Sequence, residues 1–310
     1  MRQGICPVSC AAKGELHRCN NGTPHARTAH TARIARTARI TRITRIAIET
    51  RDMEKHKHKR KRTKLIIIIL ATYFLIVGVV AAVHVFSTQH AYVVAQQEYD
   101  RLRLQAPQAT PFATAGSTGD DANAIAEAEA AKRAAQLMSI NSDYIGWIII
   151  EDTTINYPVV QTTNNDTYLH TTFEHEYNAS GTIFMDSRCT GGFSHPAAIV
   201  YGHNMMDGSM FASLNKYLDI DFLSQHLRVT VITPDGKTHR YTIFKVLRTN
   251  SYDEAYDLPD KSPAERTAFL RSLGASGEGD TLMLSTCTSA GNSNERLIVF
   301  ATRIDSEKTK

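Results

Sequence analysis

The sequence predicts a mainly β protein in which about eight strands close into a barrel, behind one membrane-spanning helix. Short runs of β-branched and aromatic residues, separated by turn residues, recur from residue 141 onward. An uncharged apolar stretch occupies residues 65–86. Helix-forming segments stand before the first strand and before the strand that ends in Cys287. We therefore expect a barrel with an N-terminal helix and one inserted helix.

Charge is distributed unevenly along the 310 residues, whose formal net charge is +4. Residues 1–64 contain 17 Lys and Arg and four acidic residues, a net charge of 17 − 4 = +13, and residues 65–86 contain none of these residues. The remainder therefore carries 4 − 13 = −9. Because the basic charge belongs to a tail and the predicted barrel is acidic, we expect no nucleic-acid partner.

Residues 65–86 are predicted to anchor the chain in a membrane. This stretch has one His and no full charge, and as a helix it spans roughly 33 Å. A basic run at residues 55–64 stands directly before it, and such runs stay on the cytoplasmic side. The rest of the chain is then extracellular. A cleaved signal peptide is the alternative, but Ser87-Thr88-Gln89 is a poor cleavage site.

Residues 1–52 contain a repeat that places Arg at every third position of residues 31–46, a spacing that forms no buried face. Met53 precedes the basic run and the anchor as a natural start would. We interpret residues 1–52 as the product of an over-long gene model, with a disordered cytoplasmic tail as the alternative.

Residues 87–120 are predicted to be a stalk, because residues 105–120 are rich in Pro, Thr, Gly and Ser, although residues 92–104 are compatible with a continued helix. Residues 121–140 are rich in Ala and Glu and predict a helix that leads into a domain at residues 141–305.

The eight predicted strands are short and apolar. Asp235-Gly236 stands between two of them, which is a strong hairpin signal. The strand-like runs are residues 147–150, 153–157, 181–185, 197–201, 227–232, 239–246, 281–284 and 297–301. Between the last hairpin and residue 281, Ser262, Pro263 and Glu265 form a capping box that begins a helix, and Gly274 ends it.

Cys287 is the candidate nucleophile. A Cys at a strand end is more often an inert small hydrophobe, but here Ser285, Thr286, Thr288 and Ser289 surround it, as at the mouth of a barrel. An extracellular domain with only two cysteines is not a disulfide scaffold, although pairing with Cys189 stays open. The other cysteines, Cys6, Cys10 and Cys19, precede the anchor.

Two further residues point to the same edge of the barrel. Arg296 begins the strand after Cys287, and if the two strands are adjacent its guanidinium reaches the sulfur, where it favours the thiolate or holds an oxyanion. His203 directly follows a predicted strand and Gly202, and is the best placed of the 13 histidines to lie there too.

The order Tyr-Gly-His at residues 201–203, Thr-Leu-Met-Leu-Ser-Thr-Cys at residues 281–287 and then Arg296 resembles the sortases, a family of cysteine transpeptidases. The resemblance covers residues 139–304. Class B is the most similar subgroup, on the motifs Trp147-Ile148, Tyr-Pro-Val-Val-Gln at residues 157–161, Tyr168-Leu169 and residues 181–186, and on the helix before the cysteine strand. Some class B members carry an acidic residue just beyond the cysteine, whereas this chain has Thr288-Ser289-Ala290.

The resemblance implies that Cys287, His203 and Arg296 are catalytic. Cys287 would attack the carbonyl after Thr in a C-terminal sorting motif, of the Asn-Pro-x-Thr type, of a secreted protein and form a thioester. His203 would act as acid and then as base, Arg296 would hold the oxyanion, and Ser285 and Thr286 would contact substrate. The acceptor would be an amine of a peptidoglycan precursor or the lysine of a pilin, and no cofactor or metal is implied.

Other classes fit the residues less well. An L,D-transpeptidase needs His and Gly directly before its Cys, and a papain-like peptidase places Cys before His. Outside the tail, no His or Cys pair has the spacing of zinc ligands. A non-catalytic anchored binding module explains the membrane segment but not the His, Cys and Arg at strand ends.

Overall fold

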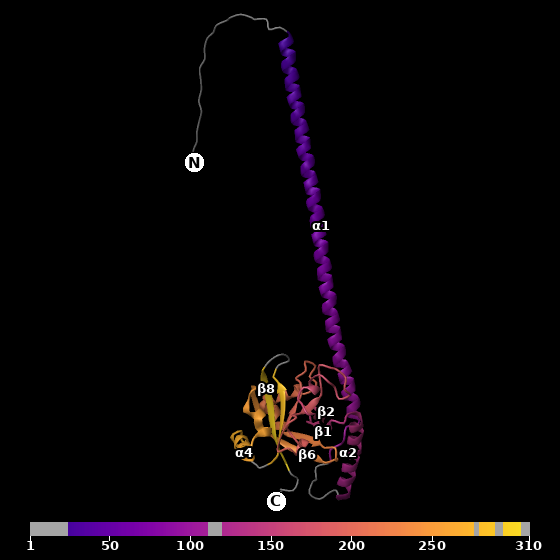
Figure 1. The fold of residues 1–310 in the computed structure, drawn as a ribbon, viewed down its shortest axis with the longest axis vertical. Helices are drawn as coiled ribbons and strands as arrows, with labels where there is room; N and C mark the ends of the chain where they lie inside the picture. The colour runs from indigo at the N-terminus through magenta and orange to yellow at the C-terminus, as the bar shows by residue number, and fades with distance from the viewer. Residues whose placement is uncertain (1–23, 111–119, 276–278, 289–293, 305–310) are drawn as a thin grey trace, which may run out of the picture. The chain divides into compact units, whose positions relative to one another are not determined.

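The computed structural model describes residues 24–110, 120–275, 279–288 and 294–304, in a chain that divides into two compact units, Met1–Ala81 and Ala82–Lys310 (Figure 1). The first unit holds most of one long helix. The second holds the end of that helix and a β-barrel with its surrounding helices.

The long helix α1 covers Pro24–Leu104 and runs through the predicted anchor without a break. It contains one segment that is long and apolar enough to cross a bilayer. Residues 24–52 are helical too, a conformation that the three-residue repeat did not predict. Ile40, Ile43 and Ile46 of the repeat are exposed, so this part of the helix has no buried face, as expected. Residues 1–23 of the predicted tail lie outside the described residues.

Residues 87–104 belong to α1 and not to a stalk, and over residues 92–104 this is the continued helix that the sequence allowed. The end of α1 packs on the barrel. Ala95, Tyr99 and Leu102 recur at helical spacing and are buried in the main core. The Tyr99 hydroxyl donates to the carbonyl of Gly181, 2.5 Å away. These buried contacts hold residues 87–104 helical, whereas residues 106–110 have no regular structure and residues 111–119 of the predicted stalk are not described.

Helix α2, Asp120–Ile140, is the predicted N-terminal helix, and its Ala130, Ala134 and Leu137 enter the core. The turn of the predicted hairpin packs against it. Gly236 has φ of +84°, and a Cβ there would lie 2.0 Å from the carbonyl oxygen of Glu127 in α2. Only glycine fits both the backbone conformation and the close approach.

Eight strands form a closed barrel in the order β1-β2-β3-β4-β7-β8-β6-β5, which confirms the predicted fold class. The pairs β2–β3 and β4–β7 are parallel, and all others are antiparallel. The strands are β1 Tyr144–Ile149, β2 Asn156–Val160, β3 Ile183–Met185, β4 Ala197–Tyr201, β5 Arg228–Ile232, β6 Thr238–Asn250, β7 Thr281–Cys287 and β8 Glu295–Arg303.

Side chains of β7 and β8 alternate between two cores, as the period of a strand requires. Leu282, Leu284, Leu297 and Val299 belong to the main core inside the barrel, and their neighbours belong to a second core on the outer face. The 3-10 helix η4, Glu254–Asp260, and α4, Pro263–Ser272, cover this second core. In Figure 1, α4 and α2 lie on opposite sides of the barrel.

Helix α4 confirms the predicted capping box. The Ser262 side chain accepts from the backbone N–H of Glu265, and the Glu265 carboxylate accepts from the backbone N–H of Ser262. The remaining short helices lie between strands: η1 Thr167–Leu169, η2 Gly192–Ser194, η3 Ala212–Leu218 and α3 Ile220–Gln225.

We predict that Tyr99→Phe lowers the free energy of unfolding by about 1–3 kcal/mol, because the Gly181 carbonyl then loses this buried donor. The measurement is urea unfolding of the full chain in detergent, followed by the fluorescence of Trp147, the only tryptophan. Tyr252→Phe is the control, since Tyr252 is 85% exposed. Equal midpoints for the two variants would contradict the role given to Tyr99.

Candidate active site

A cavity of about 430 Å³ opens where β4, β7 and β8 meet. Because β4 and β7 are parallel, with Tyr201 opposite Ser285, their C-terminal ends reach the same edge of the barrel. The cavity is lined by Asn165, Leu169, Phe184, Asp186, Arg188, Tyr201, Gly202, His203, Ser251, Tyr256, Ser285, Thr286, Cys287 and Arg296. The three residues predicted to be catalytic therefore line one cavity.

Cys287 and Arg296 are direct cross-strand partners in the β7–β8 ladder. Facing residues of an antiparallel pair project to the same side of the sheet, so the thiol and the guanidinium emerge on one face. Both side chains are partly exposed. The adjacency that the sequence required of these two strands is confirmed.

His203 lies two residues beyond β4, and its Nε2 is 2.8 Å from the carbonyl oxygen of Leu169. Since a carbonyl only accepts, Nε2 carries the hydrogen, and Nδ1 is the ring atom left to exchange a proton. Burial lowers the pKa of His203 below its ordinary value, the hydrogen bond to Leu169 opposes this, and the charge of His170 lowers the pKa further. The His170 ring stacks on it with centroids 6.0 Å apart.

Gly202 lets the side chains of Ile183 and Phe211 approach the backbone directly before His203. A Cβ at Gly202 would lie 2.5 Å from Cδ1 of Ile183 and 2.6 Å from Cγ of Phe211. The Phe211 N–H donates to the His203 carbonyl, and the Asn204 side-chain amide donates to the carbonyl of Cys287 at 2.9 Å. The segment that carries His203 is thus hydrogen-bonded to the end of the cysteine strand.

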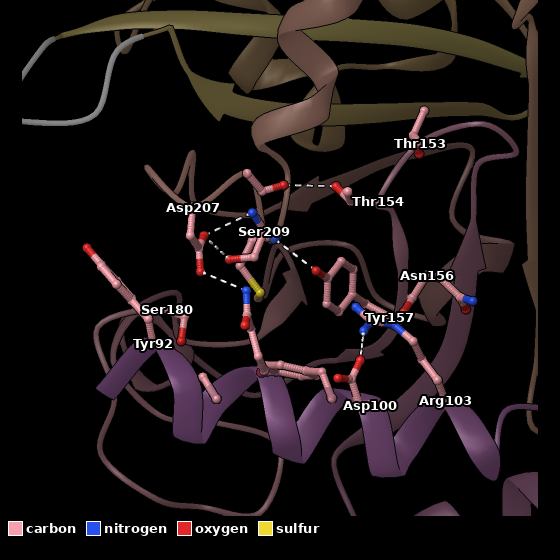
Figure 2. Close-up of a pocket in the computed structure, with 15 residues that line it drawn as sticks. Tyr92, Asp100, Arg103, Thr153, Thr154, Asn156, Tyr157, Ser180, Asp207 and Ser209 are labelled. Carbon is pink, nitrogen blue, oxygen red and sulfur yellow. Dashed lines mark hydrogen bonds and ion pairs between the residues drawn. The ribbon is translucent and has the colours of Figure 1, made fainter. Parts of the chain in front are cut away.

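Residues 207–210, in the segment that follows His203, line a second cavity of about 440 Å³ beside α1 (Figure 2). There Met210 donates its N–H to the Tyr157 hydroxyl, Thr154 donates to the Gly208 carbonyl, and Gln96 of α1 reaches Asp207 at 3.4 Å. The described residues that line this cavity include no Cys or His, so it offers none of the predicted chemistry. The hydrogen bonds in this cavity instead hold residues 207–210 against β2, Thr154 and α1.

Ser285 and Thr286, predicted to contact substrate, both line the first cavity but differ in environment. The Ser285 hydroxyl is 2.8 Å from the Tyr256 hydroxyl. Thr286 faces the barrel interior with Leu284, and its hydroxyl oxygen is buried without a hydrogen-bond partner among the residues that the structure describes.

Cys189 is a free, fully buried thiol and does not pair with Cys287. Burial raises the pKa of Cys189 to about 11, which keeps it protonated and unreactive at neutral pH. Its sulfur lies 3.6 Å from the Ala197 carbonyl. Of the two cysteines described, Cys287 is therefore the accessible one.

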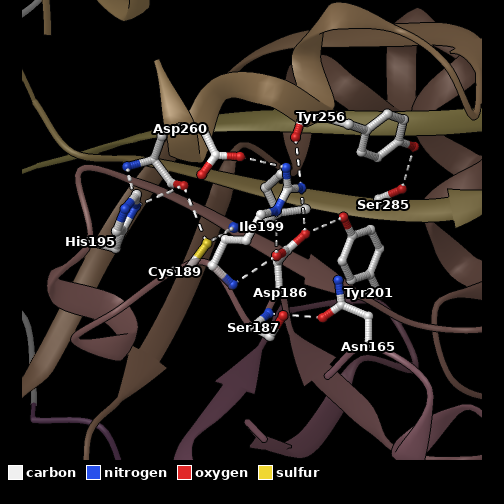
Figure 3. A network of polar contacts seen from close by, with 12 residues as sticks. Asn165, Asp186, Ser187, Cys189, His195, Ile199, Tyr201, Tyr256, Asp260 and Ser285 are labelled. Atoms are coloured by element: carbon white, nitrogen blue, oxygen red, sulfur yellow. Dashed lines mark hydrogen bonds and ion pairs between the residues drawn. The ribbon is translucent and has the colours of Figure 1, made fainter. Parts of the chain in front are cut away.

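Sequence reasoning missed the polar wall of the cavity, shown in Figure 3. Asp186 is buried, and it binds Arg188 and the Tyr201 hydroxyl. Asp186 and Tyr201 stood in motifs used for the family resemblance, but no residue pattern indicated their contact. Tyr256 carried no signal, because η4 comes to the cavity from a different part of the chain.

The three residues directly after Cys287 are Thr288, Ser289 and Ala290, none of them acidic, and Ser289 and Ala290 lie outside the described residues. The carboxylate next to this edge is Glu295, which accepts from the Thr288 hydroxyl at 2.9 Å and pairs with Arg248 at 2.7 Å. Glu295 is exposed and engaged by these two side chains.

Comparison with known proteins gives consistent matches. The sortase domain family model matches residues 148–304. Over 181 residues the chain is 36% identical to sortase B of Listeria monocytogenes. The aligned region covers 55% of this chain and 73% of that protein. Sortase B of Staphylococcus aureus is 30% identical over 180 residues, covering 54% and 72%.

Solved structures agree with this match. A mutant form of Clostridium perfringens sortase B superposes with a TM-score of 0.58 and 28% identity, covering 68% of this chain and 98% of that structure. Together with the barrel, the family-model match and the identity to the two curated proteins, this likeness places the chain in one family. The chain belongs to the sortase family of cysteine transpeptidases, in its class B.

Proposed function

We propose that this chain is a membrane-anchored, extracytoplasmic sortase that cleaves a C-terminal sorting motif after Thr and transfers the secreted protein to an amine of a peptidoglycan precursor. The observation that carries the proposal is the register of β7 and β8, which pairs Cys287 with Arg296 at the mouth of a cavity also lined by His203. A nucleophile, a proton carrier and a fixed cation are the groups that acyl transfer through a thioester requires.

The proposed topology follows from the apolar segment and its flanking charge. Residues 65–86 anchor the chain, the basic residues 55–64 stay in the cytoplasm, and the catalytic domain at residues 141–305 is extracellular. The packing of Ala95, Tyr99 and Leu102 on the barrel extends this domain by the end of α1.

In the first half of the proposed reaction, Nδ1 of His203 takes the Cys287 proton and the thiolate attacks the carbonyl carbon after Thr. As the tetrahedral intermediate collapses, the imidazolium returns the proton to the leaving amine, and the thioester remains on Cys287. The bond between Nε2 and the Leu169 carbonyl supports this role, because it holds the ring with Nδ1 free and stabilises the imidazolium.

In the second half, neutral His203 accepts a proton from the incoming amine, which attacks the thioester and releases the thiolate. Burial lowers the pKa of His203 and so favours the neutral imidazole that this step needs. The proton returns to Cys287 at the end of the cycle, so the catalyst is regenerated without a cofactor.

Arg296 is proposed to hold the oxyanion of both tetrahedral intermediates. Its backbone is fixed by ladder pairing to Cys287 on one side and to Thr249 on the other. A charge placed in advance on the same face as the nucleophile needs little reorganisation when negative charge develops. Ser285 lines the cavity on the same face as Cys287 and remains a proposed substrate contact, whereas the Thr286 side chain faces the barrel interior and is not proposed to be one.

We predict that Cys287→Ala abolishes thioester formation with an Asn-Pro-x-Thr peptide while the fluorescence-detected unfolding midpoint stays within a few degrees of wild type. Mass spectrometry of the trapped acyl-enzyme measures the effect. Cys189→Ala is the matched control, because that thiol is buried away from the cavity, and it should still form the adduct. Normal transpeptidation by Cys287→Ala would contradict the proposal.

Replacement of Arg296 by Gln should lower kcat/KM by about 10²–10³-fold, the usual effect of removing one oxyanion donor. Arg248→Gln is the control. Arg248 is exposed, adjoins Thr249, the ladder partner of Arg296, and forms a salt bridge with Glu295. Peptide cleavage kinetics measure both variants. Similar losses in the two would indicate a general charge effect rather than a specific role for Arg296.

We predict that His170→Gln raises the pKa of His203 toward the ordinary value of a histidine, because the charge on the stacked imidazole of His170 helps burial to lower this pKa in the wild type. An NMR titration of the histidine side chains measures this pKa. His90→Gln, which changes an exposed histidine of α1, should leave it unchanged. An unchanged or lower His203 pKa in His170→Gln would refute the coupling.

A further inference from the structure

Asp186 and Arg188 form an ion pair in the wall of the cavity, and the proposed reaction uses neither residue. Asp186 directly follows β3 and its side chain is 0% exposed. Arg188 binds it with two hydrogen bonds, from Nε to Oδ1 at 3.0 Å and from Nη2 to Oδ2 at 2.8 Å. The Tyr201 hydroxyl donates to the same carboxylate at 2.8 Å. Burial alone raises the pKa of Asp186, but these hydrogen bonds outweigh it and hold the pKa below the ordinary value.

The same guanidinium also reaches η4, which belongs to a distant part of the chain. Nη1 of Arg188 donates to the Asp260 carboxylate at 2.8 Å, and Nη2 donates to the Tyr256 carbonyl at 2.8 Å. Figure 3 shows Asp186 on one side of this group, and Asp260 with the Tyr256 carbonyl on the other. One planar cation therefore joins the end of β3 to both halves of η4.

The segment held in this way forms part of the cavity wall. Tyr256 lines the cavity, stacks on Tyr201 with ring centroids 6.3 Å apart, and places its hydroxyl 2.8 Å from that of Ser285. Ser285 lies on the same face of β7 as Cys287. A shift of η4 would therefore move a wall of the cavity beside the nucleophile.

Apolar packing alone leaves the orientation of η4 loosely defined. Ala255 and Leu258 are buried against the second core. Glu254, Asp257 and Asp260, which recur at every third position, are exposed. Non-directional burial favours contact with the barrel, and directed hydrogen bonds to a rigid strand end select one orientation. Arg188 supplies two of these, and the Tyr256 hydroxyl a third.

We propose that Arg188, held by Asp186, is a positioning residue that fixes η4 and so sets the Tyr256 wall against which the sorting-motif peptide binds. This inference rests on the proposed function for its kinetic part. It assigns Asp260 and Arg188 to the fit of the acyl-donor peptide and gives them no part in bond making or breaking.

The test is a comparison of Asp260→Ala with Asp257→Ala in the full chain, using an Asn-Pro-x-Thr peptide as probe. Asp260 is the preferred target because its side chain is 63% exposed, so its removal strands no buried charge. We expect Asp260→Ala to raise KM about 3–10-fold with kcat changed less than twofold. Asp257, an exposed acid of the same helix outside the network, should leave both parameters within twofold.

Hydrogen–deuterium exchange provides a second readout that needs no turnover. Amides of residues 254–260 should exchange faster in Asp260→Ala than in wild type or Asp257→Ala, while those of β7 stay unchanged. Arg188→Lys, which keeps the charge but loses the planar fork, should show the same pattern with a larger KM change.

The outcomes separate the two proposals. A loss of kcat at constant KM, or equal exchange in Asp260→Ala and wild type, would overturn the positioning role even in an active enzyme. Absence of peptide cleavage by the wild type would refute the proposed function, whereas the exchange result would still decide whether Arg188 fixes η4. If Arg188→Lys does not fold, the Asp260 and Asp257 pair decides alone.

Discussion

The pairing of β7 with β4 on one side and β8 on the other is the constraint on which the site depends. The parallel β4–β7 pair brings the segment with His203 to the edge where β7 ends, and the antiparallel β7–β8 pair turns Arg296 back to face Cys287. Three residues from distant parts of the chain thus meet at one edge. Because ladder hydrogen bonds fix their backbones, the relative positions of Cys287 and Arg296 are set before any substrate binds.

Because side chains alternate along a strand, the two faces of β7 lie in different environments. Leu282 and Leu284 fill the barrel, while Met283, Ser285 and Cys287 face outward toward η4. Cys287, the proposed nucleophile, therefore lies over a packed interior yet remains partly open to solvent on the outer face. Cys189 shows the contrast, since its thiol is buried and the pKa of that thiol rises to about 11. Access and neighbouring charge, rather than residue type, distinguish the two cysteines.

Segments outside the strands complete the site from two directions. The end of α1 packs on the barrel through Tyr99 and contacts the loop after His203 through Gln96 and Asp207. On the other side, the buried Asp186–Arg188 pair binds η4 and with it Tyr256. The segment that follows the apolar stretch is thus part of the same compact unit as the barrel.

Local patterns in the sequence predicted the strands of the barrel, the capping box at Ser262 and the apolar segment, because each depends on residues near one another in the chain. They also marked Cys287, His203 and Arg296 as candidates, but the pairing of β7 with β4 and β8, which brings these residues to one cavity, came from the structure. The same reasoning extended a stalk over residues 87–120, although it allowed a helix at residues 92–104, and it did not find Tyr256 or the contact of Arg188 with Asp260. Packing of α1 and the docking of η4 are long-range contacts, and no local period encodes which surface a helix will meet. Only the tertiary structure decided those, since burial and directed hydrogen bonds between segments distant in the sequence select them.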